Sequence, residues 1–451
     1  MVLVTNLEKD DLSSIILDDI IKEMRLGGNT MITAITGINW GDEGKGRMVD
    51  LLSEGYNVIC RYQGGNNAGH TVINDKGKFV LNLLPSGILR DGTTNVMGNG
   101  MVIDMEHLCG ELETLKEKGI NVTSESLKIS DKAFICLPYH KFQDVLEEDR
   151  LADKQYGSTR RGIAPSYGDK YMKKGLRMGD LFDMDSLAEK LKDIIEWKNL
   201  TLSGYNATVN FDEIYEWVKK YGVQLKSYVT DVTEFLTASI TAGEDILFEA
   251  QLGALRDIDF GIYPYTTSSQ TLAAYAPIGA GIPGVKLDHV IGVMKAYSSC
   301  VGEGPFTAEM FGEEAEALRE AGGEYGAATG RPRRVGGFDI PASKYGILMQ
   351  GADEIALTKL DILSYCDKIP VCVAYDVDGV QTKQFPTGDK LMRAKPVYEY
   401  LAGFKADVSK CRKAEDLPKE AMDYIRYIEK ETGCPIKYVS VGPGREDYLK
   451  L

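Results

Sequence analysis

The sequence has few residues of the kinds that build metal centres and disulfide frameworks. Only four histidines occur, and none of the eight cysteines stands in a CxxC spacing, so a zinc site is not expected and the thiols are expected to be reduced. No apolar run approaches the roughly 18 residues that cross a bilayer. The first residues also lack the basic and apolar regions of a signal peptide. These absences predict a cytoplasmic protein.

A surplus of positive charge is also missing. Lys and Arg number 52 against 67 Asp and Glu, which gives the 451-residue chain a formal net charge of −15. This balance argues against a nucleic-acid or membrane surface spread over the whole protein. A local basic site for a phosphorylated small molecule stays possible. The hydrophobic content of 43% is that of an ordinary globular protein.

Strand-like and helix-like segments alternate along most of the chain. Residues 1–30 differ, because an apolar stripe edged with acids predicts an amphipathic helical extension there. Strands are then predicted at 31–37, 57–62, 96–103, 245–249, 288–296, 355–359, 370–376 and 436–441, and helices near 104–118, 186–197, 210–220, 226–241 and 417–431. No repeat or linker divides the chain. The pattern predicts an α/β fold in which residues 31–451 form a single large domain on a mainly parallel sheet with flanking helices.

A glycine-rich segment follows the first predicted strand. Asn39-Trp-Gly-Asp-Glu-Gly-Lys-Gly46 resembles a degenerate phosphate-binding loop (P-loop), in which backbone N–H groups and a lysine face an anion. The usual pattern, GxxxxGK[ST], would place glycine at position 39 and Ser or Thr at position 46. A magnesium ligand must therefore come from elsewhere, and Asp42 is the candidate because Mg²⁺ prefers hard oxygen ligands. The alternative is a tight turn with a surface lysine.

Four further segments carry candidate ligand groups. Residues 63–71 present three side-chain amides and His70, which could act on a leaving phosphate oxygen, although a lone histidine is more often structural. Residues 157–170 and the arginine-rich 329–334 each fit either an anion site or a charged surface loop. Residues 357–361 match [NT]KxD, whose carboxylate selects guanine, but so short a match also arises by chance.

Taken in order, these segments resemble the adenylosuccinate synthetase family, whose members join aspartate to inosine monophosphate (IMP) with GTP. The resemblance covers residues 31–451 and is carried by NWGDEGKG, GGNNAGHT, RGIAPSYGDK, DIDFGIYPYTTSS, KAYSSCVGEGPF, TGRPRR, LTKLD and SVGPGR. It implies a GTP-dependent ligase of purine biosynthesis that works through 6-phosphoryl-IMP. It also implies Mg²⁺, with GTP as co-substrate, and a homodimer.

The same resemblance implies a role for individual residues. Asp42 is the implied general base, His70 the implied general acid, and Asp42 with Gly69 the implied Mg²⁺ ligands. The implied IMP contacts are Asp42, Glu43, Gly44, Lys45, Asn67, Ala68, Gly69, His70, Thr159, Lys173, Thr267 and Arg331. The implied GTP contacts are Gly41, Asp42, Glu43, Gly44, Lys45, Gly46, Arg47, Gly69, His70, Thr71, Arg333, Lys359, Leu360, Asp361, Ser440, Val441 and Gly442. The implied aspartate contacts are Ala327, Ala328, Thr329, Gly330, Arg331, Pro332 and Arg333.

Several positions depart from the family pattern. Leu252 stands where the family has a glutamine that contacts the phosphoryl group, and Gln251 lies one place early, so that contact is lost unless the loop shifts its register. Lys173 replaces an arginine that reaches the partner subunit's IMP phosphate. The remaining departures are Cys300 for arginine, Ala328 for threonine and Gly337 for tryptophan.

These departures leave three alternatives. The ordinary reaction of IMP with aspartate is favoured. A divergent paralogue would ligate an amino acid to another 6-oxo purine nucleotide. A catalytically silent GTP-binding regulator is disfavoured, because a protein that only binds GTP needs no acid and base such as Asp42 and His70.

Overall fold

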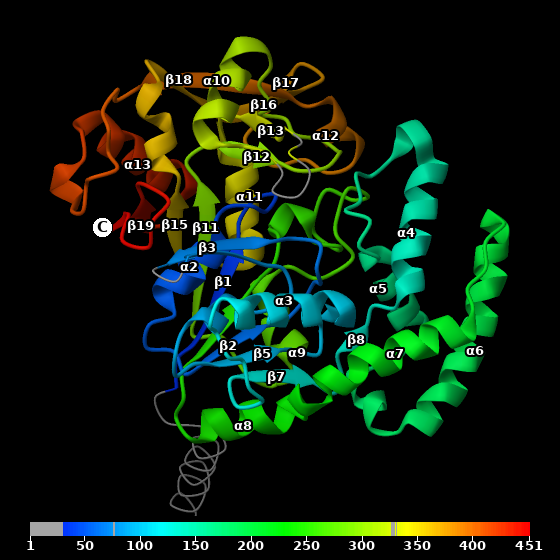
Figure 1. The fold of residues 1–451 in the computed structure, drawn as a ribbon. Coiled ribbons are helices and arrows are strands. Elements are labelled where there is room, and N and C mark those ends of the chain that lie inside the picture. The colour runs from blue at the N-terminus through cyan, green and yellow to red at the C-terminus, as the bar shows by residue number, and fades with distance from the viewer. Residues whose placement is uncertain (1–29, 75–76, 326–329, 331) are drawn as a thin grey trace, which may run out of the picture.

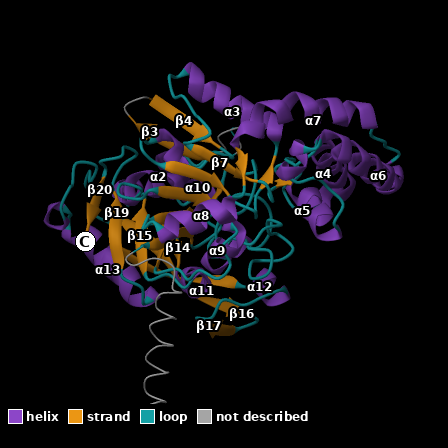
Figure 2. Ribbon diagram, turned by 90° about the horizontal axis from the view of Figure 1, so that it is seen from below, coloured by secondary structure: helices purple, strands orange, loops and turns teal. Residues whose placement is uncertain are grey.

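The computed structural model describes residues 30–74, 77–325, 330 and 332–451. Apart from Thr30, the predicted helical extension of residues 1–30 lies outside the described residues. Within them, a ten-stranded sheet is flanked by helices on both faces, and α4 to α7 lie together at one end of the molecule (Figures 1 and 2). The predicted α/β architecture is confirmed.

The ten-stranded sheet has the order β20-β19-β15-β11-β1-β10-β2-β5-β7-β9. Every neighbouring pair is parallel except β19 with β20. The strand bounds are β1 Ile32–Gly37, β2 Val58–Arg61, β5 Thr94–Met97, β7 Leu127–Ser130, β9 Val229–Thr230, β10 Ile246–Glu249, β11 His289–Lys295, β15 Glu354–Thr358, β19 Ile436–Ser440 and β20 Tyr448–Lys450. All six residues of β1 are buried, as expected of a central parallel strand covered on both faces.

The helices bury apolar faces against this sheet and against one another. Their bounds are α2 Lys45–Leu52, α3 Met105–Glu117, α4 Pro138–Leu151, α5 Ile163–Met172, α6 Met184–Leu202, α7 Phe211–Leu225, α8 Val232–Thr241, α9 Ala276–Ala280, α10 Gly312–Gly322, α11 Ile340–Gln350, α12 Asp389–Arg393 and α13 Lys419–Thr432. Side-chain caps fix several starts: Asp104 accepts a hydrogen bond from the His107 N–H at the start of α3. No helix in the described part of the chain has the length and apolar character needed to cross a membrane.

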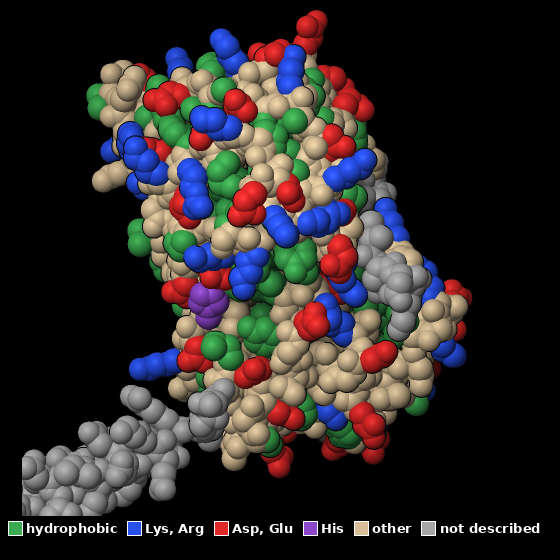
Figure 3. Space-filling model, turned by 90° about the vertical axis from the view of Figure 1, so that its left-hand side faces the viewer, with side chains coloured by type: hydrophobic (Ala, Val, Ile, Leu, Met, Phe, Trp, Pro, Cys, Tyr) green, Lys and Arg blue, Asp and Glu red, His purple; other side chains and the backbone are tan. Residues whose placement is uncertain are grey.

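Smaller sheets extend the body beyond the central one. Their strands are β3 His70–Asn74, β4 Gly77–Leu81, β6 Val102–Ile103, β8 Phe134–Ile135, β12 Ser298–Cys300, β13 Arg334–Gly336, β14 Phe338–Asp339, β16 Lys368–Val377, β17 Val380–Thr382 and β18 Lys395–Ala402. The strand predicted at 370–376 is β16, which pairs with β14, β17 and β18 and not with the ten-stranded sheet. On the face drawn in Figure 3, acidic and basic side chains are interspersed.

Three predicted elements differ from the structure. The strand predicted at 96–103 is interrupted at Gly98, where a Cβ would lie 2.5 Å from the carbonyl oxygen of Gly279, and resumes as β6. The helix predicted at 226–241 starts only at Val232, because the Asp231 side chain caps it there. The loop predicted at 157–170 ends in α5, whose Ile163 and Tyr167 pack into a small apolar cluster.

Candidate active site

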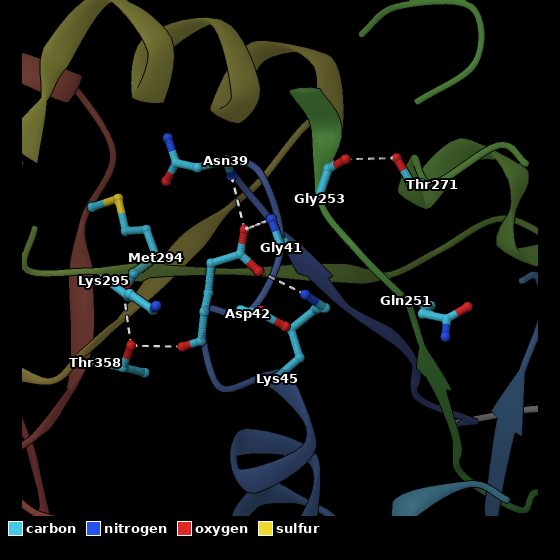
Figure 4. A network of polar contacts seen from close by, with 12 residues as sticks. Asn39, Gly41, Asp42, Lys45, Gln251, Gly253, Thr271, Met294, Lys295 and Thr358 are labelled. Atoms are coloured by element: carbon cyan, nitrogen blue, oxygen red, sulfur yellow. Dashed lines mark hydrogen bonds and ion pairs between the residues drawn. The ribbon is translucent and has the colours of Figure 1, made fainter. Parts of the chain in front are cut away.

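The P-loop joins β1 to α2 and is held in shape by a buried glutamate. Glu43 is 2% exposed, and its carboxylate accepts hydrogen bonds from the backbone N–H groups of Asn39 (3.1 Å) and Gly41 (2.8 Å) and pairs with Lys45 at 2.6 Å (Figure 4). Gly41 and Asp42 have φ of 102° and 59°, in the left-handed region. The result is a tightly folded loop in which the Asp42 side chain stays 28% exposed.

His70 packs directly against this loop. A Cβ on Gly46 would lie 2.5 Å from the Cβ of His70, so the Ser or Thr of an ordinary P-loop has no room here. His70 Nδ1 lies 2.5 Å from the Glu249 carboxylate, which also accepts hydrogen bonds from the N–H and hydroxyl of Ser86. Burial would raise the pKa of Glu249, but His70 and these hydrogen bonds hold that pKa below its usual range. Glu249 therefore stays charged and fixes the imidazole.

The C-terminal loop closes over the start of α2 through Arg47. Its guanidinium donates to the Ser440 hydroxyl and to the carbonyl oxygens of Gly442, Gly444 and Asp447. Five donors in a planar fork suit such a set of acceptors. The structure thereby joins two of the predicted GTP-binding segments, which lie at opposite ends of the chain.

The third predicted GTP-binding segment, residues 357–361, lies against the P-loop. The Thr358 hydroxyl donates to the Glu43 carbonyl oxygen at 2.6 Å. Burial raises the pKa of Asp361, while the charges of Arg47 and Lys359 oppose that rise. Leu360 and Val441 are buried in one apolar cluster. The predicted GTP residues are thus gathered around one loop.

A second buried glutamate, Glu324, was missed from the sequence. It is fully buried, and its carboxylate contacts Lys295 (2.9 Å), Lys359 (2.6 Å) and Arg333 (2.8 Å), while the Tyr297 hydroxyl donates to it at 2.5 Å. Burial would raise the pKa of Glu324, but Lys295 and Lys359 hold it far below its usual range. Burial lowers the pKa of Lys295 to about 8. No spacing or motif around Glu324 distinguishes it from other acids of this acidic chain.

Arg333 connects this cluster to the P-loop. Its guanidinium lies 3.1 Å from the Asp42 carboxylate while another of its nitrogens contacts Glu324. The ion pair holds the Asp42 carboxylate beside the Glu324 cluster. His70 packs on Gly46 of the same loop, while Arg47 reaches from α2 to the C-terminal loop.

Comparison with known proteins identifies the family. A family model described as adenylosuccinate synthetase matches residues 34–449. An adenylosuccinate synthetase of Streptococcus sanguinis is 44% identical over 415 residues, which is 91% of this chain and 96% of that protein.

The chain belongs to the adenylosuccinate synthetase family.

Solved structures agree with this assignment. The fully ligated adenylosuccinate synthetase of Plasmodium falciparum is similar with a TM-score of 0.88 and 37% identity, over 94% of this chain and all of that one. A succinoaminodeoxyadenylate synthetase of cyanophage S-2L, bound to dGMP and dATP as an energy donor, has a TM-score of 0.62 and 20% identity over 94% of this chain and 96% of that one. The second likeness supports the fold alone.

The loop after β10 carries Gln251 and Leu252, where the sequence departs from the family pattern. Gln251 is fully buried, and its amide bonds the backbone of Gly65 (3.2 and 3.0 Å) and the carbonyl oxygen of Ala68 (3.2 Å). It therefore holds the 65–68 loop and does not take the place of the missing glutamine. Leu252 has φ 64° and would contact a Cβ placed on Gly41 at 3.3 Å. A leucine in this conformation costs on the order of 1–2 kcal/mol, which marks the position as constrained.

The predicted IMP phosphate residues lie on separate segments. Thr159 is exposed, and its loop is held where the Ser158 hydroxyl donates to Asp144 at 2.7 Å. Thr267 is half-buried, and its N–H donates to the Arg256 carbonyl oxygen at 2.9 Å. Lys173 is exposed at the end of α5 with φ 62°, and the structure gives it no contact with either threonine.

Around Asn67, the backbone is positioned by amide side chains. Asn67 Oδ1 accepts from the Gly65 N–H at 3.3 Å, and Asn82 donates to the Ala68 carbonyl oxygen at 3.2 Å. Of the predicted aspartate loop, Gly330 and Pro332 are exposed. The predicted contacts Ala327, Ala328, Thr329 and Arg331 lie outside the described residues.

Proposed function

We infer that the chain catalyses the GTP-dependent ligation of L-aspartate to IMP through a 6-phosphoryl-IMP intermediate, giving adenylosuccinate, GDP and phosphate. Membership of the family supports this reaction, as does the geometry around the P-loop. The observation that carries it is that Asp42 lies in the P-loop and His70 packs on Gly46 of the same loop, and each has an ion-pair partner, Arg333 or Glu249. A GTP-binding regulator would have no need of that pair.

The proposed first step activates the purine. Asp42 takes the N1 proton of IMP, and the 6-oxygen attacks the γ-phosphorus of GTP, so that the bond to the β–γ bridging oxygen breaks and GDP leaves. His70 donates to a phosphoryl oxygen as charge builds. In the second step the neutral aspartate amine attacks C6, the C6–O bond breaks, and phosphate departs with the proton that the amine nitrogen loses. Phosphorylation turns a poor leaving group into a good one, and the protein contributes mainly positioning and charge.

The guanine subsite is proposed at Asp361. Its carboxylate accepts from guanine N1–H and N2–H₂, for which adenine has no equivalent pair. Lys359, Leu360, Ser440, Val441 and Gly442 complete the proposed pocket. The support is that Arg47 already ties the 440–442 segment to the P-loop helix.

Mg²⁺ is proposed to be held by Asp42 and the carbonyl oxygen of Gly69. The partly exposed Asp42 carboxylate fits a hard cation. Among the described residues no group of three or more His, Cys, Asp or Glu gathers as a metal cage, so waters and phosphate oxygens would complete the shell, as is common for Mg²⁺. The ion would neutralise charge on the GTP phosphates.

We propose a homodimer in which Lys173 reaches the partner's IMP phosphate. Its exposed position at the end of α5, beside the exposed Tyr171 and Met172, supports this role. A dilute monomer should then lose IMP affinity, and an unchanged Michaelis constant for IMP would refute the role of Lys173.

The eight unpaired cysteines support the proposed cytoplasmic location.

We also propose that residues 1–30 form a helical extension that docks on the catalytic body, residues 31–451, or on a neighbouring subunit. Deletion of residues 1–29 should alter assembly more than turnover. Unchanged assembly and kinetics would contradict a docking role.

The decisive experiment is a product assay with Mg²⁺, GTP, IMP and aspartate, in which each substrate is left out in turn. Adenylosuccinate, identified by mass and matched by GDP and phosphate, is expected only from the complete mixture. GTP binding without turnover would favour the regulator, and a product only from another 6-oxo purine nucleotide would favour the paralogue.

Asp42→Ala tests the proposed base. Turnover should fall by about a thousandfold or more, since one aligned acid or base contributes 10²–10⁴-fold, while GTP binding by calorimetry stays largely in place. Glu54→Gln, an exposed acid just beyond α2, is the matched control and should keep wild-type turnover. Substantial residual activity in Asp42→Ala would remove Asp42 from this role.

A further inference from the structure

The guanidinium of Arg256 lies against Cys300, the position at which the family pattern has an arginine. Cys300 is 1% exposed, at the end of β12. The guanidinium of Arg256, which comes from the loop after β10 and is 7% exposed, lies against it, with Nη2 3.1 Å from Cys300 Sγ. One buried guanidinium, from the loop after β10, therefore lies against the end of β12.

Arg256 uses that guanidinium to tie separate segments together. It donates to the carbonyl oxygens of Tyr265, Val301 and Glu303. Its own carbonyl oxygen accepts from the Thr267 N–H at 2.9 Å. One residue therefore fixes the backbone on both sides of the 265–267 turn and the 301–303 loop.

The 301–304 loop depends on such anchors because its backbone is irregular. Gly302 and Gly304 have φ of 83° and 101°. Arg334 holds the Gly304 carbonyl oxygen at 2.8 Å, while Arg256 holds those of Val301 and Glu303. The same loop reaches the Thr159 segment, since a Cβ on Gly157 would lie 3.1 Å from the Gly302 Cα.

We propose that Arg256 supplies the guanidinium absent at Cys300 and is a positioning residue for the IMP site, holding the segments that carry Thr267 and Val301 and, through the 301–304 loop, the one that carries Thr159. The proposal rests on the proposed function, with Thr159 and Thr267 taken as contacts of the IMP phosphate. Only a guanidinium suits the position, because its acceptors lie in different directions and a planar fork meets them together.

A double-mutant cycle tests the proposal, with Arg256→Leu, Cys300→Arg and the double variant. Arg256→Leu should raise the KM for IMP by about tenfold or more, since small misplacements at such sites are costly, while the KM for GTP stays near the wild-type value. Cys300→Arg alone should lower the melting temperature, because two guanidinium groups would crowd one buried space. The double variant should recover both the melting temperature and the KM for IMP.

Arg256→Lys separates charge from geometry, and it should fold while keeping most of the defect in IMP binding. An unchanged KM for IMP in Arg256→Leu, equal changes in both Michaelis constants, or a double variant no better than its parents would overturn the proposal. Failure of the proposed function shows separately, as absence of adenylosuccinate from the wild-type protein. In that case the coupling between the two positions is still measured by the melting temperatures of the four proteins, and additive shifts would overturn the replacement.

Discussion

Glu324 and Asp339 are both fully buried carboxylates, yet their surroundings are opposite. Glu324 contacts three cations, Lys295, Lys359 and Arg333, and its pKa is held far below its usual range. Asp339, at the start of α11, is bonded by the Ala342 N–H and the Tyr375 hydroxyl, and burial raises its pKa to about 7. The surroundings of Glu324 therefore favour a charged carboxylate, whereas those of Asp339 favour the neutral acid.

The difference in pKa follows from the charged groups around each carboxylate. Around Glu324, three cations meet one carboxylate, while Asp42 pairs with Arg333 and the charge of Lys359 acts on Asp361. Each cation of this region therefore has a carboxylate close by. Asp339 instead caps a helix behind the site. Its loss should affect stability and leave the chemistry intact.

Glu324→Gln is expected to have the largest effect on this comparison. Breaking a buried ion pair by removing one partner costs about 3–5 kcal/mol, and here Lys295, Lys359 and Arg333 would all lose their carboxylate. The free energy of unfolding should fall accordingly, and kcat/KM for GTP should drop by about a hundredfold as Arg333 and Lys359 lose their positions. Denaturant unfolding and initial rates measure both effects.

Glu316→Gln is the matched control, because Glu316 lies on α10 with 62% exposure and pairs with Arg319 on the same helix. It should change either quantity by little, as surface ion pairs contribute about 1 kcal/mol or less. Equal effects of the two variants would mean that the Glu324 cluster has no special part in holding Arg333 and Lys359.

Glu249→Gln tests whether His70 needs the negative charge of its carboxylate partner for turnover. Glutamine keeps a hydrogen-bond acceptor for His70 but removes the negative charge beside the imidazole. We expect kcat to fall by about tenfold to a hundredfold with the KM for GTP nearly unchanged. If the KM rises and kcat does not, His70 serves in binding and not in proton transfer.

Much of the arrangement was predictable where local pattern and local structure coincide. The apolar alternation before Gly37 predicted β1, and the glycines after it predicted a loop that approaches a ligand. The roles proposed for Asp42 and His70 came from the family resemblance. Local pattern could not give the partners of these two residues, since Arg333 and Glu249 are far from them in sequence.

The departures from the family show the same limit. At Gly337, where the family has a tryptophan, a Cβ would lie 2.6 Å from the Pro370 carbonyl oxygen and 3.0 Å from Tyr398 Cε1, so no larger side chain fits there. At Cys300, the neighbouring guanidinium comes from Arg256. Such neighbours are seen only in the folded structure, because segments far apart in the sequence come into contact there. The spacing of residues in the sequence does not predict which of them will meet.

Asp361→Asn should have a smaller effect, confined to nucleotide choice. An amide presents one donor group and one acceptor to guanine in place of two acceptors, so the preference for GTP over ATP should shrink by about tenfold or more. Rates with each nucleotide measure it. Asp367→Asn, at an 80% exposed acid, should leave the preference as it is. An unaltered preference in Asp361→Asn would place the guanine elsewhere.

Asp339→Asn should have the smallest effect on turnover and a clear effect on stability. Asparagine still caps α11 by accepting from the Ala342 N–H. The folded-state pKa of Asp339, about 7, lies above its ordinary 3.8, so the stability it contributes is fully present below about pH 4 and is lost as the pH rises through about 7. Since one pKa unit corresponds to about 1.4 kcal/mol, the variant should gain on the order of 2–4 kcal/mol over wild type between pH 4 and pH 8. Asp183→Asn, at the exposed cap of α6, should show no such gain, and a pH-independent difference for Asp339→Asn would mean that its carboxyl stays charged in the folded protein.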